Sequence, residues 1–152
     1  MARKLKIYFD TSVPNAYIDS RNPIRQEITK NLWEKLHQYK IFVSDLVVEE
    51  IEATGDEIKK KHLLDLVKGF ERLSSSGEEI ETLAEEYVRR RIIPAKYIED
   101  ATHIAVATVY SLDVLVSWNF EHMVKLKTKR EVNVVNILLG YNQLEIVEPT
   151  ML

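Results

Sequence analysis

The sequence predicts an α/β domain of three layers, in which helices cover both faces of a mainly parallel central sheet. Short segments rich in β-forming residues alternate along the chain with longer segments whose apolar residues recur at helical spacing. The 152 residues are 45% hydrophobic and include only 4 Gly and 4 Pro, so the chain can bury one substantial core. There are no internal repeats and no long linker, so we expect a single domain over residues 1–152.

Each strand and helix is assigned from its apolar pattern and its terminal residues. The first strand contains Ile-Tyr-Phe, and Thr11 and Ser12 can cap a short helix whose first turn holds Pro14. Gly140 ends the last helix, as glycine commonly does. We expect strands at 6–9, 41–43, 114–116 and 144–147. We expect helices at about 12–20, 24–39, 46–53, 63–70, 80–88, 95–110 and 131–139.

Composition excludes several classes of site. Without cysteine, the chain has no disulfide, no zinc–thiolate centre and no thiol nucleophile. No apolar stretch approaches the ~20 residues of a membrane span, and we expect a soluble cytoplasmic protein that does not contact a membrane. The net charge of −3 argues against a surface that is basic all over, but nucleic-acid binding depends on local patches.

Three acidic residues lie at the edges of apolar segments. Asp10 follows the first strand, Glu50 lies in the helix after the second, and Asp100 opens the helix that precedes the third. The crevice at the carboxyl ends of parallel strands is the usual binding site, so we expect these side chains to meet there, near Asn119. Gathered carboxylates repel one another unless they are protonated or neutralised, and Mg²⁺ favours oxygen ligands. The sequence therefore predicts a metal site.

Four segments together resemble the signature blocks of PIN-domain proteins, which include VapC-type toxins. The blocks are Asp10-Thr11-Ser12, Ser44 to Ile51, Glu99-Asp100-Ala101-Thr102-His103-Ile104-Ala105 and Leu115-Val116-Ser117-Trp118-Asn119. The resemblance covers essentially the whole chain. It implies an α/β/α fold, a homodimer, and a Mg²⁺- or Mn²⁺-dependent endoribonuclease that cuts single-stranded RNA and is inhibited by a cognate antitoxin protein.

The resemblance also implies roles for individual residues. Asp10, Glu50 and Asp100 would be the metal ligands and catalytic acids, with Asn119 as a fourth catalytic residue. Thr11, Ser12 and Ser117 would support them, Thr11 or Ser12 by ordering the first carboxylate. Glu49 is the rival of Glu50, and Glu50 is preferred because it stands six residues after Ser44 and directly before Ile51.

The fourth block departs from the family pattern, because His122 stands where the family commonly has an acidic residue. Imidazole suits Mn²⁺ better than Mg²⁺, so either a shifted metal preference or a weak second metal subsite would follow. A catalytically weakened PIN-like domain that binds RNA or protein is therefore the alternative function. A haloacid-dehalogenase-like hydrolase ranks low, because Ser12 occupies the second position of the required Asp-x-Asp.

Ordinary structural roles compete with several of these assignments. Asp10 could simply cap the helix that follows it, and Asp100 could simply stabilise the N-terminus of its own helix through the helix dipole. His103 is more readily explained as a packed helix histidine than as a ligand. Trp118 could stack on an RNA base, although packing explains it better. Lys125, Lys127, Lys129 and Arg130 form the basic cluster nearest the site, and we expect this cluster to bind nucleic acid.

Overall fold

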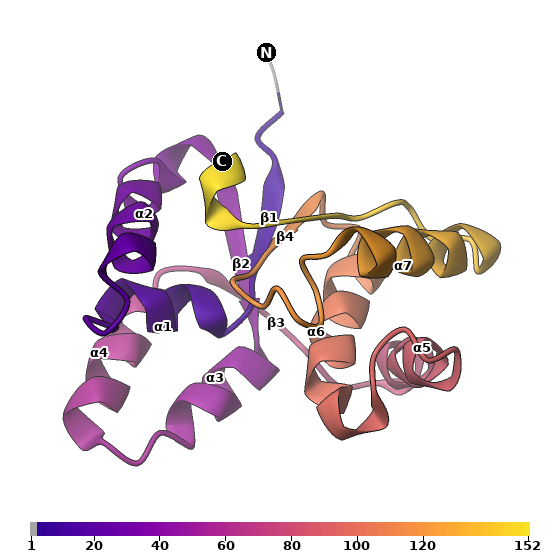
Figure 1. Ribbon diagram of the computed structural model, residues 1–152, viewed down its shortest axis with the longest axis horizontal. Helices are drawn as coiled ribbons and strands as arrows, with labels where there is room; N and C mark the ends of the chain where they lie inside the picture. The colour runs from indigo at the N-terminus through magenta and orange to yellow at the C-terminus, as the bar shows by residue number, and fades with distance from the viewer. Residues whose placement is uncertain (1–2) are drawn as a thin grey trace.

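The computed structural model describes residues 3–152 and contains one five-stranded sheet (Figure 1). The strands are β1 (Lys6–Phe9), β2 (Lys40–Ser44), β3 (Glu71–Leu73), β4 (Val114–Val116) and β5 (Glu145–Val147). All neighbouring pairs are parallel, in the order β3-β2-β1-β4-β5. The α-helices are α1 (Ser12–Ile18), α2 (Pro23–Trp33), α3 (Asp45–Glu52), α4 (Glu57–Val67), α5 (Glu78–Arg89), α6 (Ile98–Val109) and α7 (Leu126–Leu138). Short 3₁₀ helices lie at Leu36–Gln38, Ala95–Tyr97 and Pro149–Met151.

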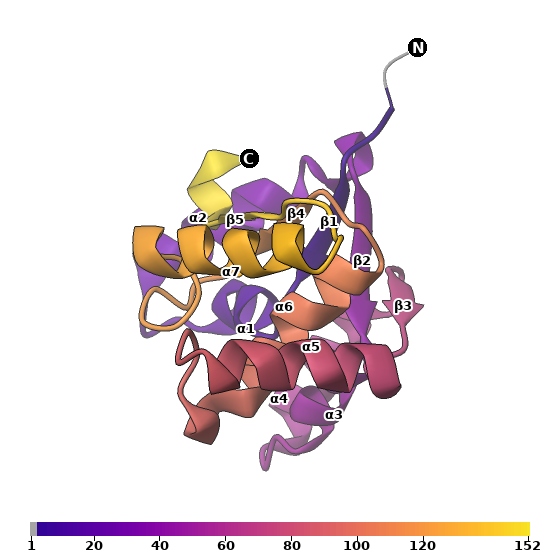
Figure 2. The same ribbon diagram turned by 90° about the vertical axis from the view of Figure 1, so that its right-hand side faces the viewer.

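The helices form two layers around this sheet, which confirms the predicted α/β/α fold class. Helices α1, α2 and α4 lie on one side, and α5, α6 and α7 lie on the other (Figure 1). Figure 2 looks onto the second layer, where α5, α6 and α7 lie in front of the strands. The chain runs outward from β1 to β2 and β3, then returns to β4 on the other side of β1. The strand order thus reverses beside β1, the point where ligands bind in open parallel sheets.

The central strands are apolar because helices cover both of their faces. Ile7, Tyr8 and Phe9 of β1 are fully buried, as are Leu115 and Val116 of β4. Burial of the helices follows their predicted apolar positions; in α5 these are Ile80, Leu83, Ala84 and Tyr87. Among residues 3–152, no helix combines the length and the apolar character needed to cross a membrane.

Strand register brings three strand ends together. Phe9 pairs with Val116, and Tyr8 pairs with Phe42. Asp10 therefore emerges beside Ser117 at the same edge of the sheet, and the backbone N–H of Asp10 donates to Val116 O over 3.4 Å. This edge is where α1, α3 and the loop after β4 begin.

The observed elements differ from the predicted ones in four places. Helix α4 spans Glu57–Val67, whereas it was predicted at about 63–70. The predicted helix over 24–39 is α2 followed by a separate 3₁₀ turn, because the N–H groups of Glu34 and Lys35 bond three residues back, to Asn31 and Leu32, and tighten the chain. Helix α7 begins at Leu126 rather than near Glu131. Its first turn has no apolar pattern to reveal it, since the Leu126 side chain is exposed.

The fourth difference is the edge strand β3, which the sequence did not predict. Its residues Glu71 and Arg72 are exposed, so the segment lacks the apolar run or alternation that marks a strand. Only pairing with β2 defines it. The sheet consequently has five strands where four were expected, and every pairing is parallel.

Candidate functional site

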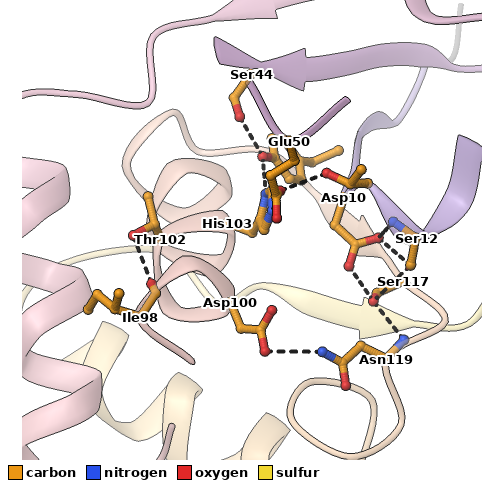
Figure 3. Close-up of polar contacts among 12 residues, drawn as sticks. Asp10, Ser12, Ser44, Glu50, Ile98, Asp100, Thr102, His103, Ser117 and Asn119 are labelled. Carbon is orange, nitrogen blue, oxygen red and sulfur yellow. Dashed lines mark hydrogen bonds and ion pairs between the residues drawn. The ribbon is translucent and has the colours of Figure 1, made fainter. Parts of the chain in front are cut away.

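Asp10 is buried at the carboxyl end of β1 and is held by two neighbouring serines (Figure 3). Its Oδ1 accepts hydrogen bonds from the backbone N–H of Ser12 at 3.1 Å and from Ser12 Oγ at 2.5 Å. Its Oδ2 accepts one from Ser117 Oγ at 2.6 Å. Ser12 Oγ also accepts from the backbone N–H of Trp118 at 2.8 Å, so one hydroxyl ties α1 to the loop after β4. Of the two candidates for ordering this carboxylate, Ser12 makes the contact.

Glu50 reaches the same region from α3. Its Oε1 accepts a hydrogen bond from Thr11 Oγ1 at 2.7 Å and lies 2.7 Å from Nε2 of His103. Glu49, one position earlier on the helix, is exposed. The structure therefore turns Glu50, rather than Glu49, toward the other acids.

A buried chain of polar groups continues from Glu50 into the sheet. The other ring nitrogen of His103, Nδ1, lies 2.6 Å from the hydroxyl of Tyr8, which lies 2.8 Å from Ser44 Oγ. Tyr8 and Ser44 are completely buried, and His103 is 2% exposed. His103 is thus neither a plain packing residue nor a free ligand, because its imidazole connects the carboxylate of Glu50 to the core.

Asp100 lies in the first turn of α6, opposite the loop after β4. Its Oδ2 accepts a hydrogen bond from Asn119 Nδ2 at 3.2 Å (Figure 3). The Oδ1 of Asn119 accepts from the backbone N–H of His122 at 3.0 Å, so this amide is fixed by both of its ends. The His122 ring stacks on Tyr97 with the centroids 4.0 Å apart, and it lines a neighbouring pocket rather than the one beside Asp100.

One pocket of about 360 Å³ is lined by Asp10, Glu50, Asp100 and Asn119. Thr11, Ser12, Asn15 and His103 complete its wall. Residues separated by up to 109 positions of sequence therefore share one cavity at the carboxyl edge of the sheet.

Burial and charge shift the titration of these groups in different directions. Burial raises the pKa of Asp10 above its usual value, although His103 and the two serines oppose the shift. Burial likewise raises the pKa of Asp100. Burial also raises the pKa of Glu50, but the hydrogen bond and charge of His103 outweigh it and leave the value lowered. The pKa of His103 is reduced by burial yet ends above normal, because Glu50, Asp10 and Asp100 favour the imidazolium.

The donor atoms in the pocket are of the kind that hard divalent cations prefer. Glu50 Oε2 and Asp100 Oδ1 accept no hydrogen bond from residues 3–152 and are available to a ligand. Within that same range, however, no three His, Asp or Glu side chains are close enough to form a ready-made cation cluster. The donor chemistry fits Mg²⁺, which keeps several waters and takes one or two carboxylates directly.

The basic cluster is divided between two places. Lys125 and Lys127 line the pocket beside His122, whereas Arg130 lines a separate apolar pocket with Arg90. Lys129 is half-buried and lines neither of these two pockets. Of the four, only Lys125 and Lys127 share a pocket with His122, whose backbone N–H donates to Asn119 of the candidate site.

Two side chains near the acids were missed from the sequence. Asn15 lines the pocket from α1, one helical turn after Thr11, and the i, i+4 spacing from the first block could have revealed it. Arg25 on α2 lies over Trp118 and Phe120 of the loop after β4. No sequence signal pointed to Arg25, because its neighbours belong to a segment more than 90 residues away.

Comparisons with solved structures find the same fold in several proteins. VapBC2 from Rickettsia felis, bound to a DNA fragment from its promoter, matches with TM-score 0.61 and 14% identity, over 95% of this chain and 98% of that one. FitAcB from Neisseria gonorrhoeae matches with TM-score 0.60 and 15% identity, over 96% and 99%. VapC20 from Mycobacterium tuberculosis, described as a sarcin–ricin loop-cleaving toxin, matches with TM-score 0.56 and 16% identity, over 91% and 98%.

Comparison of the sequence with curated proteins finds no match. The sequence model of one family, however, matches residues 7–142, and this span includes all five acidic or amide residues of the pocket. The family resemblance drawn from the four sequence blocks is confirmed. The chain belongs to the PIN domain family.

Proposed function

We propose that this protein is a metal-dependent endoribonuclease that cleaves single-stranded RNA, and that it is the toxin of a toxin–antitoxin pair. The observation that carries the proposal is the single pocket shared by Asp10, Glu50 and Asp100. Burial raises the pKa of Asp10 and of Asp100, so a bound cation would stabilise the ionised form of both carboxylates. Membership of the PIN domain family supports the same assignment.

The chain's own residues would divide the work in the pocket. Glu50 and Asp100 would offer their free oxygens to a Mg²⁺ or Mn²⁺ ion, and Asp10 would contribute from the buried end of β1. Ser12 and Ser117 hold the carboxylate of Asp10, and Asn119 holds that of Asp100, before any ligand arrives. The bound ion would neutralise the scissile phosphate and acidify the attacking water. Hydrolysis of this kind leaves a 3′-hydroxyl and a 5′-phosphate.

Cleavage of a labelled single-stranded RNA, titrated with Mg²⁺ and with Mn²⁺, tests this function. Glu50→Gln and Glu49→Gln form a matched pair, because the two glutamates are neighbours on α3 and only Glu50 lines the pocket. We expect Glu50→Gln to lower the rate by roughly 100-fold or more, since even the groups that orient metal ligands are worth about 10–100-fold. Glu49→Gln should retain wild-type activity. Equal rates for all three proteins, or cleavage that survives Asp10→Asn, would contradict the proposal.

A catalytically weakened RNA- or protein-binding module is the second candidate. It is favoured by His122, whose ring is stacked on Tyr97 and turned to the neighbouring pocket instead of supplying another acid. The test is Mn²⁺-dependent thermal stabilisation measured beside the cleavage assay. An ion at 100 times its Kd stabilises the folded state by about 2.7 kcal/mol. Stabilisation by Mn²⁺ together with binding of single-stranded RNA, but no cleavage of that RNA, would identify the binding module.

The proposed partners follow from the toxin assignment. VapBC2 and FitAcB, the structural neighbours, carry names of two-component complexes, and we propose a cognate antitoxin for this chain as well. A homodimer in solution, a cytoplasmic location and RNA contacts from Lys125 and Lys127 remain predictions. Analytical ultracentrifugation tests the first, and the salt dependence of RNA binding tests the last.

A further inference from the structure

A second pocket of about 360 Å³ adjoins the acidic one. Ser12, Asn15 and Asn119 line both pockets, so the two are neighbours that share a wall. The second pocket extends over the junction of α1 and α2, where Asn22 and Arg25 line it, and reaches Trp118 in the loop after β4. Its volume lies within the range of small-ligand sites, at the low end of roughly 300–1,000 Å³.

Arg25 is the cation of this second pocket. Its guanidinium carbon lies 5.2 Å from the ring centroid of Trp118 and 5.2 Å from that of Phe120, within the range of cation–π contacts. The guanidinium makes no hydrogen bond or ion pair with any residue in the range 3–152. The aromatic rings therefore hold the charge in place while its N–H donors remain available.

The surroundings of Arg25 are anchored. The Trp118 side chain is 7% exposed, and its indole N–H donates to Thr29 Oγ1 at 3.0 Å. The backbone N–H of Trp118 donates to Ser12 Oγ, the same hydroxyl that binds Asp10. The position of Arg25 relative to the acidic pocket is thus set by a short chain of contacts through Trp118 and Ser12.

The charge balance of the second pocket favours an anion. Asp19 is the one carboxylate among its lining residues, and Arg21 neutralises it through contacts of 2.9 and 3.3 Å. Arg25 is left as the unpaired charge, accompanied by the side-chain amide of Asn15. Proteins that bind single-stranded nucleic acids commonly combine an arginine with exposed aromatic side chains at the binding site.

We propose that this second pocket is a nucleotide subsite, in which Arg25 binds the phosphate next to the scissile one and Phe120 keeps the guanidinium oriented. The subsite rests on the proposed function, because it assumes that an RNA strand crosses the acidic pocket. It adds a residue from α2 that none of the four sequence blocks contains. The shared wall formed by Ser12 and Asn119 places the two phosphate positions side by side along one strand.

Fluorescence anisotropy with a short labelled single-stranded RNA tests the subsite. The full chain carries Asp100→Asn to suppress cleavage, and binding is measured over a series of salt concentrations. Arg25→Gln removes the charge and keeps most of the side chain. We expect about tenfold weaker binding, as for loss of a charge-assisted hydrogen bond. The slope of log K against log salt should become shallower by about 0.7, the value for one phosphate of a single strand.

Arg3→Gln is the matched control. Arg3 is also a surface arginine, but it pairs with Asp113, which precedes β4 at the amino end of the sheet, away from both pockets. We expect its affinity and salt slope to equal those of the parent. Equal losses from Arg25→Gln and Arg3→Gln would overturn the subsite, since general electrostatic attraction would then explain both.

A neutral methylphosphonate placed next to the cleaved bond makes the test specific for position. The parent protein should lose about tenfold in affinity for this RNA, whereas the Arg25→Gln variant should lose little more, because its contact is already gone. If the parent and the Arg25→Gln variant bind RNA equally well, the subsite is overturned. The same result is expected if the pocket binds a carboxylate of a partner protein instead of RNA. Melting temperatures of the variants exclude misfolding as the cause.

The two proposals fail in different ways. If the unmodified chain binds RNA through Arg25 but cleaves none with either metal, the nuclease function fails and the subsite stands. If it cleaves RNA with metal but shows no effect of Arg25→Gln on affinity or salt slope, the function stands and the subsite fails. Absence of any RNA binding overturns the subsite directly.

Discussion

Removal of one hydroxyl from the centre of the sheet, by Tyr8→Phe, tests the buried polar chain behind the acidic pocket. The hydroxyl is completely buried and bonds to His103 Nδ1 and to Ser44 Oγ. Burial raises the pKa of Tyr8 well above its usual value, so the hydroxyl stays protonated and both contacts persist over the working pH range. Phenylalanine has the same shape without this oxygen, so packing is conserved and only the polar contacts are lost.

The expected size of the effect follows from the two contacts. Each intramolecular hydrogen bond is worth about 0.5–1.5 kcal/mol net, so we expect the free energy of unfolding to fall by about 1–3 kcal/mol. In a domain of this size, 1 kcal/mol corresponds to about 2–4 °C in Tm. Urea unfolding with an unchanged m-value measures the difference.

The control for this experiment is Tyr110→Phe, at a tyrosine that is 39% exposed and should be nearly neutral. A loss below about 0.5 kcal/mol for Tyr8→Phe, or an equal loss for Tyr110→Phe, would refute the reasoning. In that case the Tyr8 hydroxyl would not be needed to hold His103 against Glu50.

Three further substitutions test the site and the fold. The pKa of Glu50 is lowered from 4.5 and that of His103 is raised from 6.5 in the folded state, so their pairing contributes fully between these values and fades on either side. In the absence of divalent ions, the difference in unfolding free energy between the wild type and Glu50→Gln should therefore be largest from pH 4.5 to 6.5. A difference that keeps growing above pH 6.5 would contradict the pairing of Glu50 with His103. Leu115→Ala, in the fully buried strand β4, should lower the free energy of unfolding by about 2–5 kcal/mol in urea, and a loss under 1 kcal/mol would mean that the cavity collapses. Gly140→Ala should lower Tm by a few degrees despite the open space around Gly140. The residue has φ +84°, and a Cβ in this left-handed conformation costs about 1–2 kcal/mol. An unchanged Tm would show that the turn rearranges.

The parts of the fold that were predictable are those whose burial leaves a pattern in the sequence. The strand before Asp10 is an apolar run because helices cover both of its faces, and Asp10 ends it at the edge where ligands bind. Asp100 and Glu50 could be located because each lies in a helix adjoining a recognisable strand. Their convergence required that the strands be parallel and that β1 lie between β2 and β4.

The parts that were not predictable depend on contacts between distant segments. Strand β3 has exposed side chains and exists only by pairing with β2. The role of His103 depends on Tyr8, which is 95 residues away in sequence. Arg25 looks like an ordinary surface residue of α2 until the loop after β4 folds against it. Local patterns carry no information about such pairings.

The central place of β1 in the sheet has a consequence for synthesis on the ribosome. Of the five strands in this sheet, β1 is the first to be made, yet one of its two neighbours, β4, is made more than 100 residues later. A nascent chain that stops before β4 leaves one edge of β1 without a partner, open to pairing with other chains. It also lacks Ser117 and Asn119, which hold Asp10 and Asp100. Whatever chemistry the acidic pocket performs is therefore withheld until β4 and the loop that follows it have been made.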